Sequence, residues 1–143
     1  MKKITLFSAG SSLGNPGAGG WACILRYKNN EKILSGGEPN VTNNQMELLA
    51  VIEGLKALNE PCDVDIFTDS NYVVKSINEW LHSWIDKNWK NNTVKNRNLW
   101  EQYLEVSKSH KIKAYWVKGH AGHEENEKCD KIANAEAEQI KRS

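Results

Sequence analysis

Long hydrophobic runs are missing from this sequence. No apolar stretch approaches the roughly 20 residues that a membrane-spanning helix needs, and the apolar residues after Lys2 and Lys3 are too few and too interrupted for a signal peptide. We therefore expect a cytoplasmic protein with no membrane partner. A chain of 143 residues is most simply one domain, residues 1–143, and such a domain buries roughly 70% of its unfolded surface.

Cysteine is also scarce. The three cysteines, Cys23, Cys62 and Cys129, are an odd number without the spacing of a metal site, which is typical of buried free thiols in a reducing cytosol. A zinc site built from His120, His123 and Cys129 matches no common zinc motif and lacks a fourth ligand. We therefore disfavour zinc.

Net charge is nearly absent, at +1, but it is unevenly distributed. Residues 86–118 hold eight Lys or Arg against three Asp or Glu, a balance of +5, and the rest of the chain holds eleven against fifteen, a balance of −4. Four tryptophans lie in or beside the basic segment: Trp80, Trp84, Trp89 and Trp100. Basic residues interleaved with aromatics can form a nucleic-acid surface. The alternative is a set of solvated helices with the tryptophans packed beneath them. The charge and tryptophan pattern, taken alone, favours this alternative.

Hydrophobic periodicity predicts how the chain begins. Alternating residues after Lys3 predict a strand with Ser8, Ala9 and Gly10 at its carboxyl end, and the residues rich in Gly, Ser, Asn and Pro that follow, through Gly17, predict a tight loop. Thr42 with Gln45 three residues later forms a capping box. This box predicts a helix whose apolar stripe runs to Leu58 and which Pro61 stops.

The same reasoning predicts the remaining elements. They are strands over 20–27, 32–36, 64–67 and 112–117, one broken or two short helices over 71–86, an irregular protruding loop over 88–98, a helix over 99–108, and a last helix that buries Cys129, Ile132, Ala133, Ala137 and Ile140. The order βββαβααβα predicts an α/β fold with a five-stranded mixed sheet flanked by helices. Its fourth strand follows a crossover helix and should lie parallel to its neighbour.

A reactive side chain is missing at the end of the first strand, where open α/β sheets usually keep their ligand sites. Position 9 is alanine. Three acids elsewhere could share a site with it: Glu47 near the start of a helix, Asp69 after the fourth strand, and Asp130 early in the last helix. Any one alone is weak evidence, because a solvated acid near a helix start is common.

Four blocks in order carry a resemblance to type 1 ribonuclease H. They are residues 7–17, 42–48, 68–73 and 116–123, the last continuing through 125–130. The resemblance covers nearly the whole chain and implies a ribonuclease H-like fold and an endonuclease that cuts the RNA strand of RNA/DNA hybrids. The family has Asp before Gly10, whereas this chain has Ala9. We interpret the chain as inactivated there, by deliberate substitution rather than as a natural pseudoenzyme.

The resemblance also implies a two-metal site. Glu47, Asp69 and Asp130 match the family's metal ligands, with Mg²⁺ as the metal and Mn²⁺ as a substitute. The aspartate that Ala9 replaces bridges both metals in the family, so its loss should cripple turnover. His120 matches a loop histidine that assists water activation or product release.

Contacts with an RNA/DNA hybrid are implied for a further set of residues. The polar matches that face the minor groove are Asn15, Thr42, Asn43, Asn44 and Asn71, Trp80 matches a tryptophan that packs on a DNA sugar, and Lys87, Lys90 and Lys95 fall in the family's basic protrusion. Turn or capping roles for the polar residues, and a core role for Trp80, are the alternatives. We expect a monomer. A non-catalytic hybrid-binding module is the second hypothesis, and a transposase or integrase nuclease is disfavoured.

Overall fold

The computed structural model describes residues 1–118 and 123–143, apart from the side chains of residues 91 and 92. Five strands form one sheet in the order β3-β2-β1-β4-β5. Strands β1 (Lys2–Ser12), β2 (Gly17–Tyr27) and β3 (Asn30–Val41) are antiparallel neighbours, and β4 (Cys62–Thr68) and β5 (Lys111–Trp116) continue the sheet in parallel with β1. The expected α/β fold with a mixed sheet is confirmed.

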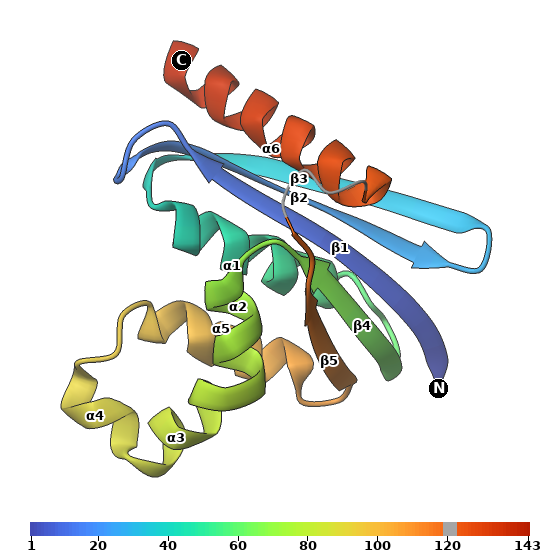
Figure 1. Ribbon diagram of the computed structural model, residues 1–143, viewed down its shortest axis with the longest axis vertical. Helices are drawn as coiled ribbons and strands as arrows, with labels where there is room; N and C mark the ends of the chain where they lie inside the picture. The colour runs from blue at the N-terminus through green and yellow to red at the C-terminus, as the bar shows by residue number, and fades with distance from the viewer. Residues whose placement is uncertain (119–122) are drawn as a thin grey trace.

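Helices cover both faces of this sheet (Figure 1). Helix α1 (Asn43–Lys56) packs on one face, and α6 (Glu124–Arg142) crosses β1, β2 and β3 on the other. Between them in the chain lie α2 (Asn71–Lys75), the π-helical turn η1 (Ser76–Trp80), α3 (Leu81–Asp86), α4 (Asn88–Asn92) and α5 (Arg97–Ser107). The larger core lies between the sheet, α1 and α5.

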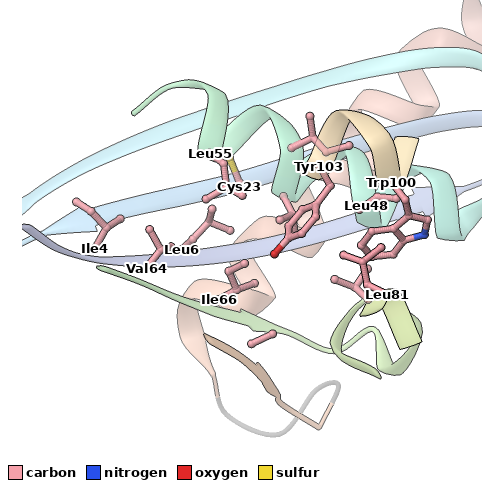
Figure 2. Close-up of a cluster of buried hydrophobic side chains, with 14 of the residues drawn as sticks. Ile4, Leu6, Cys23, Leu48, Leu55, Val64, Ile66, Leu81, Trp100 and Tyr103 are labelled. Carbon is pink, nitrogen blue, oxygen red and sulfur yellow. The ribbon is translucent and has the colours of Figure 1, made fainter. Parts of the chain in front are cut away.

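Alternation along the strands builds this core. Val64 and Ile66 of β4 point inward beside Leu6 of β1, and they meet Leu48 and Leu55 of α1 (Figure 2). Trp100 and Tyr103 of α5 close its far end, with ring centroids 5.5 Å apart. Burying apolar side chains of this size stabilises a fold by about 1.5–3 kcal/mol each.

Helix α6 approaches the sheet closely because its contact residues are small. Cys129, Ala133 and Ala137 are fully buried, and a Cβ added at Gly20 of β2 would lie 2.1 Å from the Ala133 carbonyl oxygen. Glycine at position 20 therefore lets helix and strand backbones meet. Ile132 and Ile140, expected to be buried, are only partly so.

Several strand and helix ends differ from the sequence-based expectation. Strand β2 begins at Gly17 rather than at residue 20, and β3 spans Asn30–Val41 rather than residues 32–36. The segment after Gly10, expected to be a loop, remains in β1 through Ser12, because Ser11 and Ser12 pair with Gly20 and Gly19 of β2. Helix α1 ends at Lys56 rather than at Pro61. The residue before a proline avoids helical angles, which restricts Glu60 but does not by itself account for the end at Lys56.

The expected irregular loop over residues 88–98 is wrong in part. Asn88, Trp89 and Lys90 all have positive φ, and they form the short helix α4, while α5 already begins at Arg97. Trp89 explains this order, because it is 7% exposed, packs against Trp84 and has the Arg97 guanidinium 5.2 Å from its ring centroid. Trp89 is therefore a buried contact within an otherwise polar segment.

The three cysteines are buried and free, as expected. Burial raises the pKa of Cys23 and of Cys129 to about 12. Within the described residues, no helix is both long and apolar enough to cross a membrane.

Candidate functional site at the carboxyl ends of β1 and β4

A cavity of about 490 Å³ opens where β1 and β4 end. Its walls come from four elements that are distant in the sequence: Gly10, Ser11 and Ser12 of β1, Asn43, Asn44 and Glu47 of α1, Asp69, Ser70, Asn71 and Tyr72 at the turn into α2, and Asp130 of α6. The structure therefore brings the three sequence-predicted acids, Glu47, Asp69 and Asp130, to one cavity.

Glu47 is placed by the first turns of α1. The capping box is present as expected, since Thr42 Oγ1 accepts from the Gln45 backbone N–H and Gln45 Oε1 accepts from that of Thr42. A Cβ added at Gly10 would lie 2.2 Å from the backbone nitrogen of Glu47. Only glycine at position 10 allows the helix backbone to lie this close to β1.

The pKa of the Glu47 carboxyl group is raised in this site. Burial, aided by the negative charges of Asp69 and Asp130, raises the pKa of Glu47 to about 8, against the lowering effect of hydrogen bonds from the Gly10 backbone and from Thr68. Thr68 Oγ1 lies 3.4 Å from Glu47 Oε2. Acids that raise one another's pKa at a cavity form a place where a bound cation is stabilised.

Hydrogen bonds from other elements fix the backbone around Asp69. Three successive carbonyl oxygens, those of Phe67, Thr68 and Asp69, accept from Asn126 Nδ2 at 2.9 Å, the Val117 N–H at 2.9 Å and Trp116 Nε1 at 3.1 Å. Ser70 then caps α2 by accepting from the Val73 N–H. The chain around this acid is thus fixed from β5 and from α6.

Ala9 lies beside the cavity rather than in its wall. It is 2% exposed and belongs to a small apolar cluster with Phe7 and Ala22 of the sheet and Cys129 and Ala133 of α6. Among the described residues, no group of three or more His, Cys, Asp or Glu side chains stands close enough together to hold a metal ion. The acids surround open space, and position 9 contributes no oxygen to it.

Comparison with known proteins identifies the lineage. A family model described as RNase H matches residues 1–138. The chain belongs to the ribonuclease H family. It is 65% identical over 141 residues to a protein named Ribonuclease H from Campylobacter concisus, covering 99% of this chain and 96% of that one. It is 55% identical over 138 residues to Ribonuclease HI of Helicobacter pylori, covering 96% and 95% of the two chains.

Solved structures of the ribonuclease H family share the fold. The crystal structure of LC9-RNase H1, described as a type 1 RNase H with the type 2 active-site motif, aligns with a TM-score of 0.89 at 27% identity, over 97% of this chain and 74% of that one. LC11-RNase H1 in complex with an RNA/DNA hybrid aligns with a TM-score of 0.67 at 18% identity, over 95% and 97% of the chains. The second likeness concerns the fold alone.

The polar residues expected to contact substrate fall into two groups, those that line the cavity and those whose side chains bind or cap α1. Asn43, Asn44 and Asn71 line the cavity. Asn15 Oδ1 accepts from the Asn43 N–H at 3.1 Å, and Thr42 is the helix cap, so these two side chains have structural partners in α1. Capping and access to the cavity are therefore combined at one helix start.

The other expected contacts lie away from the cavity wall. Trp80 is 39% exposed and adjoins Trp84, with ring centroids 6.1 Å apart, so the core alternative for Trp80 is wrong. Lys87, Lys90 and Lys95 are exposed on the segment around α4. His120 lies outside the described residues.

Sequence reasoning missed two residues that organise this site. Asn126 and Trp116 were part of matching blocks but received no role, although both donate to the backbone beside Asp69. The signal for Asn126 was its position one helical turn before Asp130, which places both side chains on one face of α6. No comparable signal marks Trp116, whose contact depends on how β4 and β5 pair.

Proposed function

We propose that this chain has the site of an endonuclease that cuts the RNA strand of RNA/DNA hybrids, and that Ala9 impairs it. The observation that carries the proposal is the convergence of Glu47, Asp69 and Asp130 on one cavity at the strand ends. The elevated pKa of Glu47, to about 8, agrees with it, because clustered acids of this kind favour a cation.

The donor set fits divalent metal ions. Carboxylate oxygens are hard ligands of the kind that Mg²⁺ takes, and Mg²⁺ commonly binds through one or two carboxylates while keeping several waters. A cavity of about 490 Å³ leaves room for such waters and for a phosphate group. Glu47, Asp69 and Asp130 would hold the ions, with Mn²⁺ as a possible substitute. A pair of ions bound there would supply charge stabilisation at the attacking and leaving oxygens.

The chain's own residues prepare this site. Thr68 and the Gly10 backbone orient the Glu47 carboxylate. The hydrogen bonds to the Phe67, Thr68 and Asp69 carbonyls hold the strand end still. Fixed ligands need no reorganisation when substrate binds, which is how preorganised sites accelerate reactions.

Ala9 removes one ligand from this arrangement. A methyl group has no lone pair, and a water in its place brings no negative charge. The structure of the chain around position 9 is that of a packed apolar contact with α6. We therefore propose that the chain retains the groove but turns over slowly or not at all. For that reason a non-catalytic hybrid-binding module remains the second candidate.

Substrate contact is proposed along the cavity and beyond it. Asn43, Asn44 and Asn71 would meet the minor groove of the hybrid, where 2′-hydroxyl groups are displayed. Exposed Trp80 would pack on the DNA strand, and Lys87, Lys90 and Lys95 would contact phosphates. We propose that the protein acts as a monomer.

The test compares the chain with Ala9→Asp. A hybrid carrying a labelled RNA strand is incubated with each protein in Mg²⁺ and in chelator, and Ala9→Asp/Asp69→Asn is the matched control. We expect binding by every protein and Mg²⁺-dependent RNA cleavage by Ala9→Asp alone. Equal cleavage by the chain and by Ala9→Asp would refute the role of position 9. Binding by all with cleavage by none would favour the binding module.

A further inference from the structure

Asn126 of α6 lies where β1 and β4 part. The parallel pairing of these strands ends at Phe7 and Phe67, after which β1 continues only with β2. Asn126 Nδ2 donates to the Phe67 carbonyl oxygen at 2.9 Å and reaches the Ser8 carbonyl oxygen at 3.5 Å. One side-chain amide thus joins the two strands at the point from which positions 9 and 69 follow.

The same helix face continues along β1. Asn126, Asp130 and Asn134 are spaced four residues apart, and residues at this spacing share one face of a helix. Asn134 Oδ1 accepts from Ser11 Oγ at 2.5 Å. Asp130 therefore lies between two asparagines, one tied to β1 just before position 9 and one tied to β1 just after Gly10.

Hydrogen-bond satisfaction does not explain Asn126 by itself. Its Oδ1 is buried and has no hydrogen-bond partner among the residues that the structure describes, and Ser8 Oγ is in the same condition. Leaving a buried acceptor unpaired is unfavourable. An apolar residue would avoid that penalty, but it could not donate to the two strand carbonyls.

We propose that Asn126 is a positioning residue that sets the spacing of position 9, Asp69 and Asp130, with Asn134 as its weaker companion. Asn126 lies one helical turn before Asp130, and its side chain binds the strand ends that carry position 9 and Asp69. Losing it would let these three points move apart without changing any ligand. This inference rests on the proposed metal site.

The test measures metal affinity beside stability. Asn126→Ala and Asn134→Ala are made in the Ala9→Asp protein, and Mg²⁺ binding is followed by calorimetry while urea unfolding is followed in chelator. Asn78→Ala is the matched control, because Asn78 Nδ2 donates to the Ala114 carbonyl oxygen at 3.0 Å, a bond of the same kind away from the cavity. Hybrid cleavage gives kcat and KM for each protein that cuts.

We expect Asn126→Ala to weaken Mg²⁺ binding by roughly 10- to 100-fold, the range seen when outer-shell partners of metal ligands are removed. Asn78→Ala should leave the affinity within about threefold, although both variants lower the unfolding midpoint. The kcat should fall with the affinity while KM for the hybrid changes little. Should Asn126→Ala not fold, Asn134→Ala decides, since it removes only an exposed bond, and its affinity should fall by more than that of Asn78→Ala.

Three results bear against the inference. Unchanged Mg²⁺ affinity in a folded Asn126→Ala protein would make this residue merely structural. Equal losses in the Asn126 and Asn78 variants would trace the effect to general stability. Absence of Mg²⁺ binding by Ala9→Asp itself would leave no site to position. If Ala9→Asp binds Mg²⁺ but does not cut the hybrid, the proposed function fails, and the affinity comparison still decides the role of Asn126.

Discussion

Restoring a carboxylate at position 9 should destabilise the metal-free protein. Ala9 is 2% exposed beside a cavity that already holds Glu47, Asp69 and Asp130. A like-charged pair 4 Å apart costs about 1 kcal/mol in water and about 4 kcal/mol at an effective dielectric of 20. At neutral pH Glu47 is largely protonated, because its pKa is raised to about 8, so Asp69 and Asp130 supply most of the repulsion.

The magnitude follows from how exposed these partners are. Asp69 is exposed and Asp130 is half-buried, so each pair lies nearer the water limit. We expect Ala9→Asp to be less stable than Ala9→Asn by roughly 1–3 kcal/mol at pH 7 in chelator. The asparagine variant matches the aspartate in volume and polarity, and the difference between the two isolates the charge.

The size of the effect changes with pH, and its sign changes with metal. Repulsion raises the folded pKa of the introduced acid above its unfolded value, so the penalty is absent below the unfolded pKa and grows as pH rises through the folded one. Mg²⁺ at about 1,000 times its dissociation constant for Ala9→Asp stabilises that folded protein by about 4.1 kcal/mol, which exceeds the penalty. Because Ala9→Asn lacks the added charge and should bind Mg²⁺ more weakly, the ranking should reverse. The assay is urea unfolding of both variants, in chelator and in Mg²⁺. Equal stabilities in chelator would mean that the acids do not converge on position 9.

Three further predictions test the surroundings of the site. The chain in chelator should lose stability as pH rises from about 4.5 to about 8, because the pKa of Glu47 is raised in the folded state and its stabilising contribution is lost over this range. Glu47→Gln should remove this pH dependence, which urea unfolding midpoints across the same range measure. Gly10→Ala should destabilise the fold by about 1–3 kcal/mol through overpacking against α1, while Gly14→Ala, whose Cβ would have its nearest contact at 3.1 Å, should cost much less by the same measurement. Hybrid binding should weaken as salt rises, and replacing Lys87, Lys90 and Lys95 together with neutral residues should flatten the slope of log K against log salt by up to about 0.9 per lost phosphate contact. An unchanged slope would exclude phosphate contacts by these three lysines.

Local signals predicted the parts of the fold that depend on local chemistry. The capping box at Thr42 was readable because both of its partners lie within three residues. The strand before Asp69 was readable because its alternation matches a half-buried strand. The convergence of the acids came from the pattern of a known family, since no short-range signal relates Glu47 to Asp130.

Other parts of the structure depend on contacts between distant segments. The left-handed turn at Trp89 exists because the indole packs among other tryptophans and beneath Arg97, a contact that polar neighbours in the sequence conceal. The extension of β1 to Ser12 depends on pairing with β2. The spacing of Asn126 and Asp130 places both residues on one face of the helix, but the contacts of the Asn126 amide with β1 and β4 depend on how the helix packs on the sheet.

The central claim is that metal ions bind at the cavity between position 9, Glu47, Asp69 and Asp130. Anomalous diffraction from crystals of Ala9→Asp with an RNA/DNA hybrid and Mn²⁺ tests it directly, with the unsubstituted chain as the control. We predict manganese peaks within about 2.5 Å of carboxylate oxygens of these acids in Ala9→Asp, and weaker or fewer peaks in the chain with Ala9. Manganese bound to the hybrid elsewhere, with none at this cavity in either crystal, would contradict the account.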